Sequence, residues 1–113
     1  MADQIKITPA GGTWVVRAGG AVLGESDRAL ELVEGDYPPV IYFPREDIAM
    51  AFLEASETTA RCPQKGEARF FTIHAKSGPV TDAAWSYESP NEGFEEIAGH
   101  LAFYTSSVAV EQV

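Results

Sequence analysis

The sequence predicts a single, mainly β domain with antiparallel strands and one or two short helices. Short runs rich in β-branched and aromatic residues recur along the 113 residues, and Gly, Pro, Asn and Ser separate them. These runs do not alternate with long helical segments, which argues against a doubly wound fold with a parallel sheet. The chain is also long enough to bury a core without a disulfide or a structural metal.

Composition indicates one folded unit that follows a short lead. We expect residues 1–12 to form a lead segment, with a strand inside it and a flexible Pro-Ala-Gly-Gly joint at its end. Residues 13–113 are then predicted to form a single β-rich domain, which is an ordinary size for one hydrophobic core. No internal repeat or low-complexity stretch interrupts it.

The predicted strands are short runs of alternating or β-branched residues. Gly19-Gly20 joins two of them, which predicts a tight hairpin. Residues 26–34 fit either a capped helix or a strand, and we favour the strand because Gly35-Asp36 then turns the chain toward the next apolar run. The strands are expected over Ile5–Thr8, Trp14–Ala18, Ala21–Glu25, 29–34, Val40–Phe43, Glu57–Arg61, Ala68–His74, Val80–Tyr87, and finally His100–Tyr104 with Val108–Val113 as a closing hairpin.

Two short helices are predicted. The clearer one begins after Pro44 and ends near residues 53–55, because acidic residues in its first turn suit the positive end of the helix dipole. Its apolar residues also recur at helical spacing. The second is expected over Phe94–Gly99, where the apolar residues again fall on one face.

Charge and cysteine content exclude several classes of function. Seventeen Asp and Glu against eight Lys and Arg give a formal charge of −9, which argues against binding to nucleic acid or to an anionic membrane. One cysteine excludes an internal disulfide and a cysteine-rich zinc site, and no cofactor motif is present. The start of the chain lacks the features of a signal peptide, and no stretch approaches the ~20 apolar residues of a membrane span, so we expect a cytoplasmic protein.

The most informative stretch is Thr58–Phe71, which places the only cysteine and three basic residues around a predicted turn. Its centre, Cys62-Pro63-Gln64-Lys65-Gly66, has the outline of a zinc knuckle in which Lys65 takes the place of the second thiolate. An ammonium group there repels Zn²⁺, so we predict a knuckle-shaped turn without metal. Lys65 would present a cation to a ligand, and nearby cations such as Arg61 would favour the reactive thiolate of Cys62. The alternative, which we favour, is a buried Cys62 beside a Lys65 that pairs with an acid.

A second corner suited to an anion lies where the Val40–Phe43 strand meets the predicted helix. Arg45 stands at the start of that helix, and its guanidinium and the free N–H groups of a helix start both bind anions. Pairing of Arg45 with an acid is the alternative. Tyr42 and Tyr87 are predicted to line a pocket because their hydroxyls need polar partners, whereas Trp85 is expected in the core.

Taken in order, these motifs resemble a bacterial family of small domains called domain of unknown function 427. The resemblance covers about residues 13 to 111 and is carried by Trp14-Val15-Val16-Arg17, Tyr37–Asp47, Cys62–Ala68, Ala84–Tyr87 and Ala102-Phe103-Tyr104. It implies a compact, β-tent-like fold of curled sheets, whose relatives include zinc-knuckle domains and small-molecule binders with aromatic pockets. The family is sometimes labelled nucleotidyltransferase-like, but this sequence lacks the Gly-Ser turn and paired acids of ordinary nucleotidyltransferases. Gln64 replaces a residue that is usually aromatic in the family, so one ring for the pocket is missing.

Three hypotheses for function follow. The first is a domain that binds a small polar or anionic ligand beside the 62–66 turn, without cofactor, metal, nucleic acid or membrane. The second is a small transferase-like or hydrolytic enzyme with Cys62 as nucleophile or Lys65 as acid–base group. The third is an acidic module that binds a basic protein partner. The candidate ligand-binding residues are Arg45, Lys65, Tyr42, Tyr87, Cys62 and Arg61.

Overall fold

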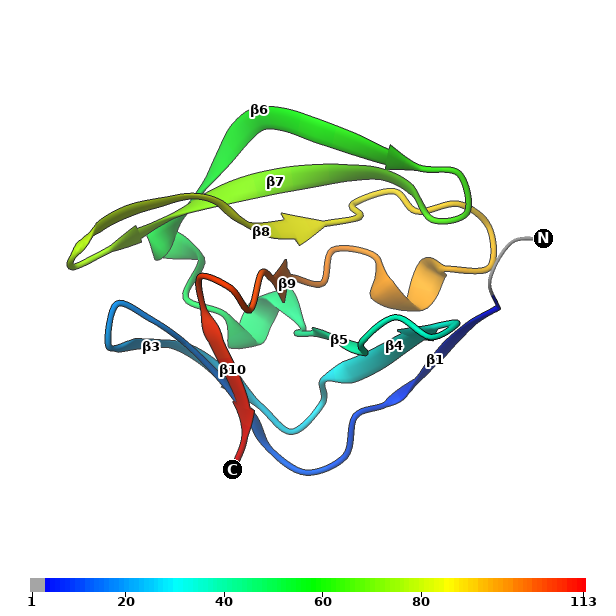
Figure 1. The fold of residues 1–113 in the computed structure, drawn as a ribbon, viewed down its shortest axis with the longest axis horizontal. Helices are drawn as coiled ribbons and strands as arrows, with labels where there is room; N and C mark the ends of the chain where they lie inside the picture. The colour runs from blue at the N-terminus through cyan, green and yellow to red at the C-terminus, as the bar shows by residue number, and fades with distance from the viewer. Residues whose placement is uncertain (1–3) are drawn as a thin grey trace.

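A computed structural model describes residues 4–113, so the first three residues of the predicted 1–12 lead segment lie outside it. Ten strands and three single-turn 3-10 helices follow one another along this part of the chain (Figure 1). The strands are β1 (Ile5–Pro9), β2 (Trp14–Ala18), β3 (Ala21–Ser26), β4 (Leu30–Glu34), β5 (Val40–Tyr42), β6 (Leu53–Cys62), β7 (Gly66–Ala75), β8 (Gly78–Ser86), β9 (Ala102–Phe103) and β10 (Ala109–Gln112). The helical turns are η1 (Arg45–Asp47), η2 (Met50–Phe52) and η3 (Glu95–Ile97). Across the described residues, no helix has the length and apolar character needed to cross a bilayer.

The strands form three antiparallel sheets, which confirms the predicted mainly β fold with only short helical segments. The largest sheet has the order β6-β7-β8-β9, and the two three-stranded sheets have the orders β1-β4-β5 and β10-β2-β3. In Figure 1, β6, β7 and β8 lie across the top of the molecule. Below them, β1, β4 and β5 lie on one side, and β3 and β10 lie on the other.

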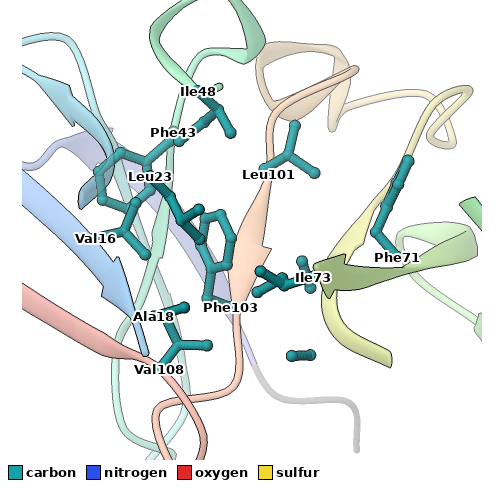
Figure 2. Packing of buried hydrophobic residues seen from close by; sticks show 12 residues of the cluster. Val16, Ala18, Leu23, Phe43, Ile48, Phe71, Ile73, Leu101, Phe103 and Val108 are labelled. Carbon is teal, nitrogen blue, oxygen red and sulfur yellow. The ribbon is translucent and has the colours of Figure 1, made fainter. Parts of the chain in front are cut away.

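Two clusters of buried side chains hold the sheets together. The main core joins the β10-β2-β3 sheet to the four-stranded sheet, and Figure 2 shows Val16 and Leu23 packed with the Phe43 and Phe103 rings. Those two rings meet edge to face, with their centroids 5.9 Å apart. The second core joins the β1-β4-β5 sheet to the four-stranded sheet, and its buried members are Leu32, Tyr42, Ala68, Phe70, Tyr87, Ile97 and Ala102.

Successive side chains of β7 and β8 lie on opposite faces of the largest sheet. Phe71 lies opposite Ala84 in the register and belongs to the main core. Phe70 lies opposite Trp85 and packs with the second core. Because side chains alternate along a strand, a residue's place in this register decides which core it meets. This alternation separates the predicted site residues into two groups, as described below.

The prediction of a helix after Pro44 is wrong. The chain makes two isolated 3-10 turns there, η1 and η2, and Ile48 between them is extended, with φ −109° and ψ 138°. Ile48 bridges to Gly24 of β3, and the N–H of Ala49 donates to the carbonyl of Leu23 at 2.8 Å. These contacts with a strand distant in sequence hold the backbone out of the helical conformation. Residues 53–55, predicted as the end of the helix, begin β6 instead.

The C-terminal hairpin and the second helix also differ from the prediction. Residues 100–104 contain β9, which pairs with β8, and β10 pairs with β2 rather than with β9. Phe103 and Val108 are both buried in the main core, so the segment between them crosses from one sheet to another. The helix predicted over Phe94–Gly99 is a single 3-10 turn.

The N-terminal strands agree more closely with the prediction. β2 and β3 form a hairpin around Gly19 and Gly20, both of which have positive φ. The ambiguous stretch 26–34 does contain a strand, β4, as favoured. β1, inside the predicted lead segment, pairs with β4 along all five of its residues.

Candidate ligand-binding site

A cavity of about 240 Å³ lies between the β1-β4-β5 sheet and the four-stranded sheet, beside the 62–66 turn. We call it the inner cavity. Its walls come from residues two apart on each strand, because alternate side chains point to the same face. β4 supplies Leu32 and Glu34, β5 supplies Val40 and Tyr42, and β7 supplies Ala68 and Phe70. Six aromatic residues line it: Tyr37, Tyr42, Phe70, Trp85, Tyr87 and Tyr104.

The polar end of the inner cavity is an ion pair between Lys65 and Glu34. The Lys65 Nζ lies 3.2 Å from Glu34 Oε1 and 5.7 Å from the centroid of the Tyr87 ring. Lys65 is only 8% exposed, which is unusual for a lysine and is compatible with this pairing. Three N–H groups of an ammonium can donate, and Glu34 is the one acceptor that Lys65 Nζ contacts among residues 4–113.

The turn that carries Lys65 is held from two sides. The Lys65 N–H donates to Cys62 Sγ at 3.4 Å, which closes the turn from within. The Asn91 side chain donates to the carbonyls of Pro63 and Gln64, at 3.3 and 3.1 Å, and the Asn91 N–H donates to the Lys65 carbonyl at 2.8 Å. The backbone around Lys65 is therefore fixed, and the ammonium group is directed into the cavity.

Two buried tyrosines, Tyr42 and Tyr87, line the same cavity. Tyr42 Oη accepts a hydrogen bond from Trp85 Nε1 at 3.2 Å. Burial raises the pKa of Tyr42 to about 12, because it outweighs the opposite effect of the Trp85 N–H on the pKa. Burial also raises the pKa of Tyr87 well above its usual value, and the neighbouring Tyr42 acts in the same direction. Both phenols are neutral donors near neutral pH.

Trp85 and Tyr104 form an aromatic wall that the inner cavity shares with neighbouring rings. Their ring centroids are 4.6 Å apart, and the planes are tilted by 46°. The Tyr104 ring also lies parallel to Phe70, with the centroids 6.2 Å apart. Trp85 was expected in the core; it packs against the second core and also lines the cavity.

The structure brings three of the six predicted site residues together. Lys65, Tyr42 and Tyr87 all line the inner cavity. Arg61 is an exposed residue of β6 that lies opposite Glu67 in the register, and it does not line the cavity. Cys62 is half-buried and packs against the second core, but it too is absent from the cavity wall.

Arg45 lies on the other face of the four-stranded sheet. Its guanidinium is 5.6 Å from the centroid of the Phe71 ring, and its Nε donates to the Gly99 carbonyl at 2.9 Å. The terminal NH2 contacts Ser86 Oγ at 3.4 Å and pairs with Glu88. Because Phe71 and Ser86 alternate with Phe70 and Trp85, Arg45 is separated from the cavity by the sheet. The alternative in which Arg45 pairs with an acid is the one that the structure has.

Sequence reasoning missed Glu34 and did not assign Phe70, Tyr37 or Tyr104 to the site. No local pattern links Glu34 to Lys65, which is 31 residues away. The signal that could identify the three aromatic residues is their place on the same sheet face as Tyr42 or Tyr87, which depends on the strand pairing. Gln64, where the resemblance predicts a missing ring, does not line the inner cavity.

The chemistry of the donor groups suits hydrogen bonding to an organic molecule. One ammonium, one carboxylate and two phenols meet beside apolar rings. In residues 4–113, no three His, Cys, Asp or Glu side chains gather closely enough to hold a metal ion. Lys65, predicted at a thiolate's place in the knuckle, contacts Cys62 through its backbone N–H and extends its side chain elsewhere.

Fold and cavity together define a small, mainly β domain with an aromatic-lined cavity that has one ion pair at its end. The chain belongs to the family described as Domain of unknown function (DUF427), whose sequence profile matches residues 6–113. A search of curated proteins found no match.

Proposed function

We propose that this domain binds a small organic molecule in the inner cavity, with an apolar or aromatic body against Trp85 and a polar end group at Lys65 and Glu34. The observation that carries the proposal is the ion pair of the buried Lys65 with the half-buried Glu34 at the end of a cavity lined by aromatic rings. Apolar walls with a few convergent polar groups are typical of ligand-binding sites. Cys62 stands outside this cavity, which disfavours the enzyme hypothesis in which its thiol is the nucleophile.

The end group that fits best is neutral overall and carries both an acceptor and a donor. Glu34 already balances the charge of Lys65 at 3.2 Å, and the whole chain carries a formal charge of −9. A carboxylate placed at Lys65 would also meet Glu34, and like charges at such a distance repel. A primary amide avoids this cost, because its carbonyl can accept from Lys65 and its N–H can donate to Glu34. An anionic ligand, one of the two kinds expected from the sequence, is therefore disfavoured.

Three probes with the same body and different end groups test this preference. They are phenylacetamide, which is neutral, phenylacetate, which is an anion, and phenethylamine, which is a cation. Binding is followed by NMR through the indole N–H signal of Trp85, which donates to Tyr42 beside the cavity. We expect phenylacetamide to bind at least about tenfold more tightly than phenylacetate. The reason is that the carboxylate of phenylacetate is repelled by Glu34, which lowers its affinity.

The Glu34→Gln variant should reverse the preference. It keeps the shape of residue 34 and leaves Lys65 with its charge unbalanced, so phenylacetate should gain at least about tenfold in affinity and overtake the amide. Arg61→Gln is the control, because it removes a charge outside the cavity from the β6–β7 hairpin that carries Lys65, and it should leave both affinities unchanged. If no probe shifts the Trp85 signal, or if Glu34→Gln leaves the order of the probes unchanged, the proposed site is wrong.

A further inference from the structure

We infer that the ligand is amphipathic and longer than the inner cavity, with an apolar extension that lies in a second cavity beyond Trp85. This inference rests on the proposed function, since it concerns the other end of the same ligand. The second cavity, which we call the outer cavity, has a volume of about 580 Å³. It lies between β5, the β9–β10 region and the Tyr37–Pro39 segment.

The two cavities are adjacent and share a wall. Tyr37, Pro38, Val40, Trp85 and Tyr104 line both of them. A molecule anchored at Lys65 and lying along Trp85 would therefore reach the outer cavity without leaving the protein surface. Tyr37 and Tyr104 are among the few large hydrophobic side chains of residues 4–113 that are substantially exposed, at 65% and 43%. Both rings line the two cavities.

Size favours a ligand that occupies both cavities. Binding sites for metabolite-sized or drug-sized ligands usually measure about 300–1,000 Å³, and the inner cavity, at about 240 Å³, falls below that range. The outer cavity is larger, at about 580 Å³, and would bring the combined site well into the range. The inner cavity alone would hold the end group and one ring.

The outer cavity is predominantly apolar. Trp14, Ile41, Phe103 and Val110 contribute hydrophobic side chains from three different strands and the buried β9. Its charged member is Glu31, and Thr105 lies in the turn after Tyr104. No basic residue lines it, so an anionic group on the extension would have no counter-charge there. An aliphatic or aromatic extension is the chemistry that such a surface recognises.

The two tryptophans of the chain report separately on the two cavities. Trp85 lines both, whereas Trp14 lines only the outer one. Trp14 Nε1 donates to the Gly11 carbonyl at 2.9 Å. Its indole N–H therefore has one defined environment, and a change in its NMR signal reports a change at the outer cavity. A short ligand should perturb Trp85 alone, and a long one should perturb both.

A length series of probes tests the inference on the full chain. Phenylacetamide and its para-methyl, para-butyl and para-hexyl derivatives are titrated against the wild-type protein, with both indole N–H signals recorded. We expect affinity to rise about twofold to fourfold for each added methylene group that becomes buried. The Trp14 signal should stay in place with phenylacetamide and move with the para-butyl and para-hexyl derivatives.

A blocking variant and its control sharpen the result. Val110→Arg places a long charged side chain in the wall of the outer cavity, and Val22→Arg makes the same change on β3, outside both cavities. Val110→Arg should abolish the gain from the alkyl chain and leave the affinity for phenylacetamide unchanged, whereas Val22→Arg should change neither. If one of the variants fails to fold, the length series on the wild-type protein still tests the inference.

The outcomes separate this inference from the proposed function. If phenylacetamide binds but longer chains add no affinity and leave the Trp14 signal unmoved, the outer cavity is not part of the site and the inference is overturned, while the inner site stands. If no member of the series shifts Trp85, the proposed function fails, and the inference fails with it.

Discussion

Raising the pH should destabilise the folded protein through Tyr42 at the wall of the inner cavity. Tyr42 is 1% exposed, and burial raises its pKa from about 10 to about 12 in the folded state. A folded-state pKa above the unfolded one means that the stabilising contribution is complete below pH 10 and is lost as the pH rises toward 12. One pKa unit corresponds to about 1.4 kcal/mol, so Tyr42 should remove about 1.4 kcal/mol of stability between pH 9 and pH 11.

Urea unfolding at pH 9 and pH 11 measures this loss, and Tyr42→Phe isolates it. The variant lacks the acceptor for Trp85 Nε1 and should be less stable than the wild type by about 1 kcal/mol at pH 9, a difference that should disappear by pH 11. It also lacks the ionisable group, so its loss between the two pH values should be smaller than that of the wild type by about 1.4 kcal/mol. Equal losses in the two proteins, or a Tyr42 that titrates near pH 10 in the folded state, would refute the reasoning about this hydroxyl.

Three further predictions concern residues outside the cavity. Arg45→Met should lower the free energy of unfolding by about 1 kcal/mol, since its bond to the Gly99 carbonyl is lost while its partly exposed pair with Glu88 is screened by solvent, and it should leave phenylacetamide binding unchanged in the NMR titration. Gly24→Ala should cost about 1–3 kcal/mol in urea unfolding, because the added Cβ would lie 2.5 Å from the Asp47 carbonyl oxygen; no loss would mean that β3 does not hold the 47–48 segment so closely. Asp82→Gly should raise the thermal midpoint or leave it unchanged, because Asp82 has φ +51° and its buried Oδ1 has no hydrogen-bond partner among the described residues; a clear fall would show that this carboxylate has a stabilising partner.

Much of the fold could be predicted because local signals agree with the tertiary structure. The β2–β3 hairpin follows from Gly19-Gly20, whose positive φ values permit the tight turn. The 62–66 turn follows from Pro63 and Gly66, and Gly66 has φ +112°. Strands β7 and β8 follow from their apolar residues, although β7 extends beyond its predicted range at both ends and β8 begins and ends earlier than predicted.

The failures have a common physical cause, which is contact between residues far apart in sequence. The segment after Pro44 has helical spacing, but Ile48 bridges to Gly24 of β3 and stays extended. β10 resembles the second strand of a hairpin, but its register partner is β2, which lies at the other end of the chain. Local propensity cannot report such pairings.

The candidate site was predictable in part for the same reason. Lys65, Tyr42 and Tyr87 were chosen for their chemistry, and the structure places them in one cavity. Arg45 was chosen equally reasonably, but the alternation of side chains on β7 and β8 places its contacts on the opposite face. Glu34 was missed, and in the proposed site it sets the ligand preference because it pairs with Lys65. Pattern alone identified the basic residue of the pair and not the acid that balances its charge.

A crystal structure of the protein soaked with phenylacetamide is the sharpest test of the proposed site. We expect the phenyl ring against Trp85 in the inner cavity, with the amide within hydrogen-bonding distance of Lys65 Nζ and Glu34. Density for the probe only at other surfaces, or in the cavity with its amide directed away from Lys65 and Glu34, would show that the proposed site is wrong.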